Sequence, residues 1–402
     1  MPKNKEKKEI TRKNYVARFS VRGTISINDY TFSMDQHSEK SDWIYNRLNL
    51  GVNCGADNGT VYVSAMGGYG QNRQNVLYVH GKEDGKDDFS NQYTIAWEDR
   101  NDKGILDEIG DFCFKTVSIE KDTKGNLVQN RFLSEYDMIQ YLKDNLADDM
   151  CLAISGDLEW QVYNGNISVQ RNITNVVLVE DDPEKYHANF TQTVFIDKDS
   201  YSKDEYDKDK GIFYISGYVL EWFKQYNGYD LIDDAHPKGR FVPLLATFEY
   251  LPPKDKDKMV KAIKYLFKPK KGISQITFEG EFISSGAVVQ ATMDDVPDDI
   301  KELIDMGLIT EDEALTKCAD NGSRENRMVL IKPNIKKIRK DDDTIIPQIQ
   351  VFPEEYDDED FDLYFCHPAE EDEDGFTSAD DDTIPFNEDS DDDDFMKFLD
   401  EL

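Results

Sequence analysis

Arginine and aromatic side chains alternate with apolar residues along three stretches of the sequence, 15–28, 43–50 and 60–66. Apolar residues occupy every second position there, which is the period of a β-strand with one buried face. The opposite face gathers the side chains that could do chemistry: Arg18, Arg22, Trp43, Tyr45, Arg47 and Tyr62. Flat rings stack on unpaired bases at about 1–3 kcal/mol per base, and arginines pair with phosphates. The pattern predicts a face that binds single-stranded nucleic acid. The alternative is that Trp43 and Tyr45 pack beneath a following insertion.

Four further residues are weaker candidates for the same surface. Tyr69 and Arg73 belong to a glycine-rich stretch, 67–73, which we predict to be a loop. Tyr163 is expected at the tip of a later hairpin, and Arg171 on its returning strand. The lysine-rich helix predicted over 254–268 is an alternative basic patch, although lysines on a helix usually form only a solvated face.

Catalytic and metal-binding patterns are poorly represented. The sequence contains no Walker loop, no G-x-S-x-G and no H-E-x-x-H. The five histidines are far apart in sequence and have no ligand-like spacing: His37, His80, His187, His236 and His367. Paired acids carry little information in a chain with 82 acidic residues. We therefore predict a protein that is not an enzyme and that needs no metal or cofactor.

Charge and cysteine content indicate how the protein could bind nucleic acid and in which compartment it is expected. The net charge is −35, and residues 353–402 contribute 23 acidic residues against one lysine. Because the remaining residues are also acidic overall, nucleic acid could bind only at a local basic patch. The five cysteines are scattered without a C-x-x-C pair, which favours reduced thiols in a cytoplasm: Cys54, Cys113, Cys151, Cys318 and Cys366. No apolar run is long enough to cross a membrane, and residues 1–8 lack the apolar stretch of a signal peptide.

Residues 139–171 indicate which elements must position these side chains. A helix end leads into a long alternating strand, and Asn164-Gly165 turns it back into a second strand. The block recurs at a constant offset of 124 residues, where Tyr141 and Gly156 match Tyr265 and Gly280. Helix followed by long hairpin is the closing half of an OB-fold barrel, so the repeat predicts two tandem barrels. Any helix–hairpin unit would give a similar pattern, which is the alternative.

This block resembles the bacterial single-stranded DNA-binding proteins (SSB). In that family a helix ending in a Tyr-Leu-like pair precedes a strand of the form Val-x-Val-x-Gly-x-Leu, and Leu152, Ile154, Gly156 and Leu158 occupy those places. The resemblance implies a mainly β chain of tandem OB-fold barrels with insertions. We expect a flexible basic arm at 1–13 and a first barrel at 14–182 with a β-rich insertion at about 67–133. A second barrel is expected at 190–345, with a helical insertion at about 294–320. The first insertion could instead be a small separate domain.

An acid-rich tail is predicted over 353–402, where too little apolar surface is available for folding. Residues 380–386, Asp-Asp-Asp-Thr-Ile-Pro-Phe, resemble the family's acidic tail motif, with a threonine inserted and 16 residues following. The resemblance implies that the tail docks replication or recombination proteins through its apolar residues. These are Ile384, Pro385, Phe386, Phe395, Phe398 and Leu399. The alternative is a tail that only solubilises the protein.

The resemblance thus implies non-sequence-specific binding of single-stranded DNA during replication or recombination, with the tail recruiting other proteins. The size and divergence of the chain resemble a bacteriophage-encoded version, which would act in the host cytoplasm. A different class stays open, namely a protein-interaction scaffold or an acidic DNA mimic whose OB folds bind protein. The sequence leaves the oligomeric state undetermined.

Overall fold

The computed structural model describes residues 15–357 except 164, 209, 227, 233–238, 286–300, 302–324 and 340–343. Five of its strands close a first barrel. The strands are β1 (Ala17–Ser26), β3 (Trp43–Asn53), β4 (Thr60–Gly70), β9 (Cys151–Tyr163) and β10 (Asn166–Leu178). They pair in the ring β1-β3-β4-β10-β9-β1, in which only the β4–β10 contact is parallel. This ring is the strand order of an OB fold, with α2 (Glu135–Asn145) leading into the β9–β10 hairpin.

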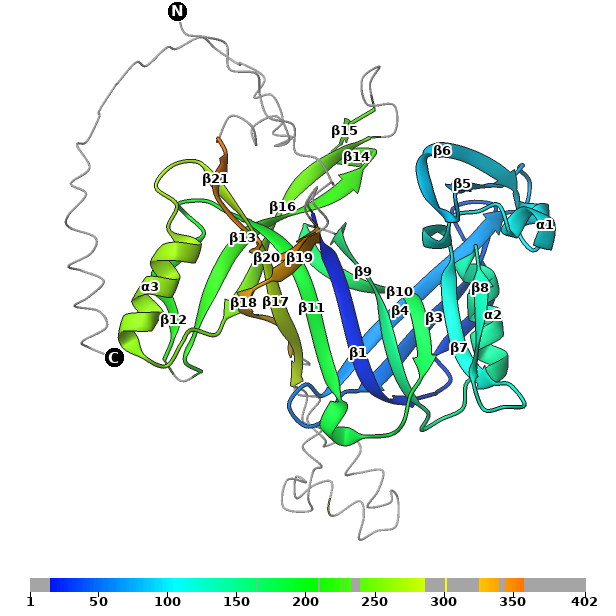
Figure 1. Ribbon diagram of the computed structural model, residues 1–402, viewed down its shortest axis with the longest axis horizontal. Helices are drawn as coiled ribbons and strands as arrows, with labels where there is room; N and C mark the ends of the chain where they lie inside the picture. Colours follow the sequence, from blue (N-terminus) through cyan, green and yellow to red (C-terminus); the bar gives the residue numbers. More distant parts are fainter. Residues whose placement is uncertain are drawn as a thin grey trace, which may run out of the picture.

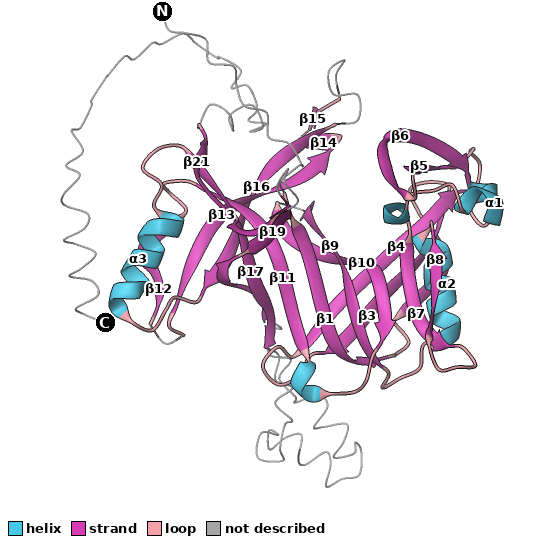
Figure 2. Ribbon diagram, viewed as in Figure 1, coloured by secondary structure: helices cyan, strands magenta, loops and turns pink. Residues whose placement is uncertain are grey.

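The second barrel repeats the ring with β11 (His187–Ile196), β13 (Ile212–Phe223), β16 (Arg240–Tyr250), β17 (Ile273–Ser285) and β18 (Glu325–Pro333). Its helix is α3 (Lys256–Phe267). The register is also repeated, because Phe19 lies opposite Gly156 and Phe190 lies opposite Gly280. A Cβ on Gly156 would lie 1.9 Å from the Asn172 carbonyl oxygen, so no larger residue fits there. The predicted mainly β fold of two tandem OB barrels is confirmed (Figures 1 and 2).

The two barrels share one sheet and one core. β1 and β11 lie side by side and pair antiparallel from Ala17 opposite Gln192 to Arg22 opposite His187 (Figure 1). Trp160 of the first barrel is only 5% exposed, and its ring meets Phe248 of the second at 5.8 Å. The second barrel begins at His187, three residues before the predicted 190.

The insertion between β4 and α2 has two parts. β7 (Lys115–Lys121) and β8 (Leu127–Phe132) extend the barrel sheet, since β7 pairs parallel with β10. β5 (Val76–Glu83) and β6 (Lys86–Ala96) form a separate hairpin, and α1 (Lys103–Leu106) and the 3-10 turn η3 (Asp111–Cys113) follow it. A small core of its own holds this part together: Val79, Ile95, Ile109, Phe114 and Leu133. The predicted loop at 67–73 is wrong in its first half, because the glycines through Gly70 complete β4.

Several strands were not foreseen or were bounded differently. β2 (Phe32–His37) pairs with β3, and β12 (Tyr201–Asp207) pairs with β13. β14 (Gln225–Tyr226) and β15 (Tyr229–Asp230) form a small ladder beyond β13. β18 ends at Pro333, and after Asn334 the strands β19 (Ile335–Arg339) and β20 (Ile345–Ile349) form a hairpin.

The beginning of the predicted tail belongs to the second barrel. β21 (Val351–Tyr356) pairs with β17, and Val351 and Tyr356 are both buried. Residues 353–356 are therefore in a strand, because these two apolar side chains outweigh the acidic composition around them. The arm 1–13, the helical insertion at 294–320 apart from Lys301, and all six apolar tail residues lie outside the described residues. No helix among the described residues is both long and apolar enough to span a membrane.

Candidate nucleic-acid interface

Two stacked aromatic rings mark the outer face of the first barrel. Trp43 and Tyr45 alternate with buried residues at the start of β3, and their rings stack at 4.8 Å with an interplanar angle of 20°. Across β4 they face Gly70 and Gly68, which present no side chains. A Cβ on Gly68 would lie 2.8 Å from the Cβ of Tyr45, so this ring begins directly against the backbone of β4. The two glycines leave the rings without side-chain neighbours on that strand.

An arginine lies at each end of the stacked pair. Arg47 is exposed on β3, opposite Met66, which is 53% exposed. Arg73 extends over Gly70, where an added Cβ would lie 2.0 Å from its Nε, and its side chain is 59% exposed. Asp42 accepts a hydrogen bond from the Asn72 N–H at 3.0 Å and lies 3.8 Å from Arg73 Nε, which orients this arginine. We call Trp43, Tyr45, Arg47, Met66 and Arg73 the aromatic platform.

The insertion makes its aromatic contacts elsewhere. Trp97 is buried and lies 5.4 Å from Tyr69 and 6.1 Å from Tyr136 of α2. Among the described residues, the ring contact of Trp43 is with Tyr45 alone. Tyr69 is opposite Ile44, on the other face of β4 from the platform. The expectation of a loop position for Tyr69 is therefore wrong, and this ring anchors the insertion to α2.

Arg18 and Arg22 form a second surface on β1. Arg18 is 68% exposed at 3.8 Å from Asp157, and Arg22 donates to the carbonyl oxygen of Glu180 at 2.9 Å. β1 meets β3 where Thr24 lies opposite Asn53. Trp43 is ten residues further along β3, which is roughly 33 Å at the rise of a strand. The single face expected from alternation is therefore two surfaces, with Tyr62 on β4 between them, opposite Gly51.

Arg171 lies between the two barrels. Its Nη1 donates to the carbonyl oxygen of Tyr62 at 3.3 Å, and its guanidinium lies 4.0 Å from the centre of the Phe282 ring. Burial lowers the pKa of Arg171 to about 10. Arg171 is thus placed to join the barrels, whereas Tyr163, 75% exposed at the β9–β10 tip, is open to solvent as predicted.

The outer face of the second barrel holds aromatic residues that the sequence reasoning missed. Trp222 is 42% exposed and meets the Phe241 ring edge-on at 4.7 Å, and Leu245 is 51% exposed beside Tyr218. We call these four residues the apolar face. The outward positions of β13 and β16 carry no lysine or arginine, unlike the platform. The alternation of Tyr214, Tyr218 and Trp222 along β13 could have revealed this face.

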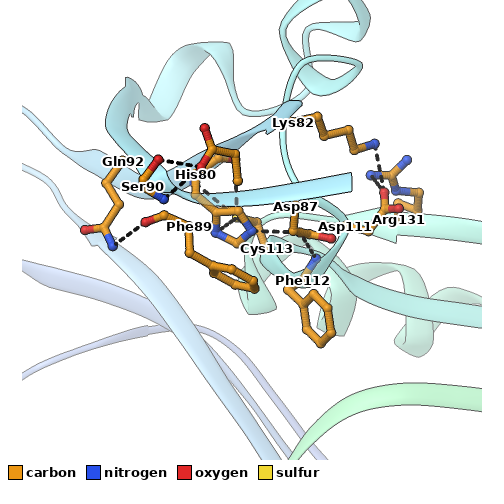
Figure 3. Close-up of polar contacts among 11 residues, drawn as sticks. His80, Lys82, Asp87, Phe89, Ser90, Gln92, Asp111, Phe112, Cys113 and Arg131 are labelled. Atoms are coloured by element: carbon orange, nitrogen blue, oxygen red, sulfur yellow. Dashed lines mark hydrogen bonds and ion pairs between the residues drawn. The ribbon is translucent and has the colours of Figure 1, made fainter. Parts of the chain in front are cut away.

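A histidine, a cysteine and an aspartate that are distant in sequence meet in the insertion (Figure 3). His80 Nε2 lies 2.7 Å from Asp87 Oδ1, and His80 Nδ1 lies 3.3 Å from Cys113 Sγ. The order of contacts is that of a cysteine nucleophile with its base and orienting acid. However, burial raises the pKa of the Cys113 thiol, and the Cys113 N–H donates to Gly110 rather than toward a substrate oxyanion. Asp87 also accepts from the Phe112 N–H at 3.0 Å, so the cluster ties β5 and β6 to the turn η3.

Comparisons with known proteins give one matching family model and two similar solved structures. No curated protein matches the sequence significantly. The wild-type single-stranded DNA binding protein from Thermus aquaticus is similar in structure, with a TM-score of 0.29 and 9% identity over 67% of this chain and 86% of that one. A deletion mutant of the same protein gives a TM-score of 0.29 and 10% identity, covering 67% and 88%. A likeness of this size carries no argument about function. The family model of YorF matches residues 76–298, which is more than half of the 402 residues, and the chain therefore belongs to the YorF family.

Proposed function

We propose that this protein binds single-stranded DNA without sequence preference through the aromatic platform. The observation that carries the proposal is the stacked pair of Trp43 and Tyr45, facing outward between Arg47 and Arg73. Both rings lie on β3, the second strand of the OB barrel, and face β4, its third strand. These two strands form the face on which such barrels bind oligonucleotides. Bases stacking on these rings would be bound whatever their identity, because every base has a flat face.

Arg47 and Arg73 would supply the phosphate contacts, whereas the negative net charge of the whole protein opposes DNA binding. A chain of net charge −35 repels DNA at long range, so binding depends on cations close to the rings. Arg47 is exposed at one end of the stacked pair, and the Arg73 side chain is 59% exposed at the other end. A strand that stacks on both rings would therefore bring its backbone within reach of each. Tyr163 at the exposed hairpin tip is a candidate for extending the path.

The biological setting follows from the family resemblance stated above rather than from geometry. It comprises replication or recombination, a bacteriophage origin and a tail that recruits other proteins. The proposed role is non-enzymatic. Free Cys54, Cys113 and Cys151 fit a reducing cytoplasm.

A second candidate function is supported by the apolar face. Trp222 and Leu245 are exposed on β13 and β16, whose outward positions carry no lysine or arginine, and an exposed apolar surface of this kind favours a protein partner over phosphate. The second barrel would then serve as a docking module while the first binds DNA.

The test is a titration of labelled oligo(dT), a mixed-sequence single strand and the corresponding duplex at several salt concentrations. The proposal predicts similar affinity for both single strands, weaker binding to the duplex and affinity that falls with salt. Absence of salt-dependent binding to any single strand would refute it and leave the protein-docking function.

A further inference from the structure

A strongly basic surface lies on the second barrel, apart from the platform. Residues 254–271, which comprise α3 and its flanking turns, contain eight lysines and two aspartates, or +6 in a chain of net charge −35. α3 buries its apolar residues Met259, Ile263 and Phe267, which directs the lysines outward. Lys258, Lys261, Lys270 and Lys271 are all exposed, and we call these four the lysine surface.

The four lysines of this surface form no ion pair within the part of the chain that the structure describes. None of its four ammonium groups has a carboxylate partner among those residues. Lys258 and Lys261 are three residues apart on α3 and therefore repel each other on the same side of the helix. An anionic segment laid across them would remove this repulsion.

The acidic C-terminal segment begins beside this surface. Ile273 pairs with Tyr356 at the end of β21, and the Lys270 N–H donates to Glu354 Oε1 at 3.1 Å. A Cβ on Gly272 would lie 2.3 Å from the Tyr356 carbonyl oxygen, so the two backbones are in contact. Residues 358–402 follow directly and contain 20 acidic residues and one lysine. The most acidic part of the sequence is thus tethered next to a strongly basic surface of the second barrel.

We infer that the lysine surface holds the acidic segment 358–402 of the same chain. Opposite charge supplies the attraction, and the tether raises the effective concentration of the segment at the surface. The surface suits DNA less well, because Tyr265 is its one exposed aromatic ring among the described residues. α3 lies at the opposite edge of the molecule from β3 and β4 (Figure 1), so the segment would be held without covering the platform. The inference does not depend on the proposed DNA binding.

Carbodiimide cross-linking of the full-length chain tests this directly, because it joins carboxylates to lysines that they contact. Mass spectrometry of a mixture of isotope-labelled and unlabelled chains separates links within a chain from links between chains. We expect links within a chain from residues 358–402 to Lys258, Lys261, Lys270 and Lys271. They should disappear at about 1 M salt, where the Debye length is about 3 Å.

A matched pair of charge reversals sharpens the test. The variant K258E/K261E should lose the links at its own positions and reduce those to Lys270 and Lys271 roughly tenfold, because several exposed charge pairs are reversed together. The control K336E/K337E changes two exposed lysines of β19 and should leave the links unchanged. Links spread evenly over exposed lysines such as Lys86 and Lys124, or concentrated on Lys336 and Lys337, would overturn the inference. So would their loss on addition of oligo(dT), which would assign the surface to DNA.

Discussion

The two barrels have the same strand ring and register but carry different aromatic groups at opposite ends of equivalent strands. The matched residues Phe19 and Phe190 allow the two barrels to be aligned. Five residues after Phe19, Thr24 lies opposite Asn53 of β3, and five residues after Phe190, Phe195 lies opposite Tyr218 of β13. Asn53 and Tyr218 are therefore equivalent positions. Trp43 precedes Asn53 by ten residues, whereas Trp222 follows Tyr218 by four. The first barrel extends β3 toward its N-terminal end, and the second extends β13 toward its C-terminal end.

This difference separates what the fold requires from what each barrel adds. The ring fixes the residues of the core and the matched glycines, which are common to both barrels. The extensions beyond the ring are free to differ, and they carry the platform with its two arginines in one barrel and the apolar face without cations in the other. The barrels are thus related in fold, and their extensions carry the side chains on which the proposed division of function rests.

The largest expected effect concerns what the barrels share. Trp160→Ala should lower the free energy of unfolding by about 3–5 kcal/mol, because the ring is buried between the barrels. Trp222→Ala removes a side chain that is 42% exposed and should reduce stability by about 1 kcal/mol or less. Urea unfolding of both variants measures this. Equal losses would mean that the inter-barrel contact is not a joint core.

A smaller effect separates the two aromatic groups in binding. Trp43→Ala should weaken the affinity for oligo(dT) by about 1–3 kcal/mol, the range for loss of one stacking ring. Trp222→Ala should leave that affinity unchanged, since the outward positions of β13 and β16 carry no lysine or arginine to contact a phosphate. Melting curves of both variants are the control. A large loss of stability in Trp43→Ala with oligo(dT) affinity intact would show that this ring is a packing residue.

The arginines allow a finer division within the first barrel. Arg47→Ala should reduce the slope of log affinity against log salt by about one, as expected for loss of a phosphate contact. Arg171→Ala should leave the slope unchanged and instead destabilise the fold, because its guanidinium rests on Phe282 between the barrels. Salt titrations with urea unfolding of each variant would distinguish the two roles. A reduced slope in Arg171→Ala would place DNA at the barrel interface.

The smallest expected effect is a pH dependence of stability that is confined to the β5–β6 hairpin of the insertion. The pKa of Asp87 is lowered by hydrogen bonds from Phe112 N–H and His80. A carboxyl whose pKa is lower in the folded state contributes stability above its unfolded pKa, near 3.8, and loses it as pH falls through the folded value. The protection of β5 and β6 amides against hydrogen exchange, relative to the unfolded chain at the same pH, should therefore fall below about pH 4, and Asp87→Asn should weaken this dependence. An unchanged profile in Asp87→Asn would show that this carboxyl does not stabilise the hairpin.

The sequence predicted the fold well, because the information needed for it is local and repeated. The helix–hairpin block recurs with its glycine, and strand alternation correctly assigned Trp43, Tyr45 and Arg47 to the face opposite the core. Alternation does not give the position along a strand, which is why Arg22 was grouped with Trp43 although the two lie on distant parts of the barrel.

Other features depended on contacts that no local pattern reveals. Arg171 has the parity of an outward residue, but the second barrel covers it. Glycines suggested a loop at 67–70, whereas they are strand residues that allow close approach. His80 and Cys113 are 33 residues apart, and only the turn after Gly110 brings them together.

Quenching of tryptophan fluorescence by oligo(dT) tests the central claim most directly. Of the four tryptophans, Trp97 and Trp160 are buried, so DNA can stack only on Trp43 or Trp222. Binding through the aromatic platform should quench the fluorescence of the wild-type protein and of Trp222→Phe, whereas Trp43→Phe should lose the quenching. Quenching that survives in Trp43→Phe and disappears in Trp222→Phe would contradict it and place the DNA on the second barrel.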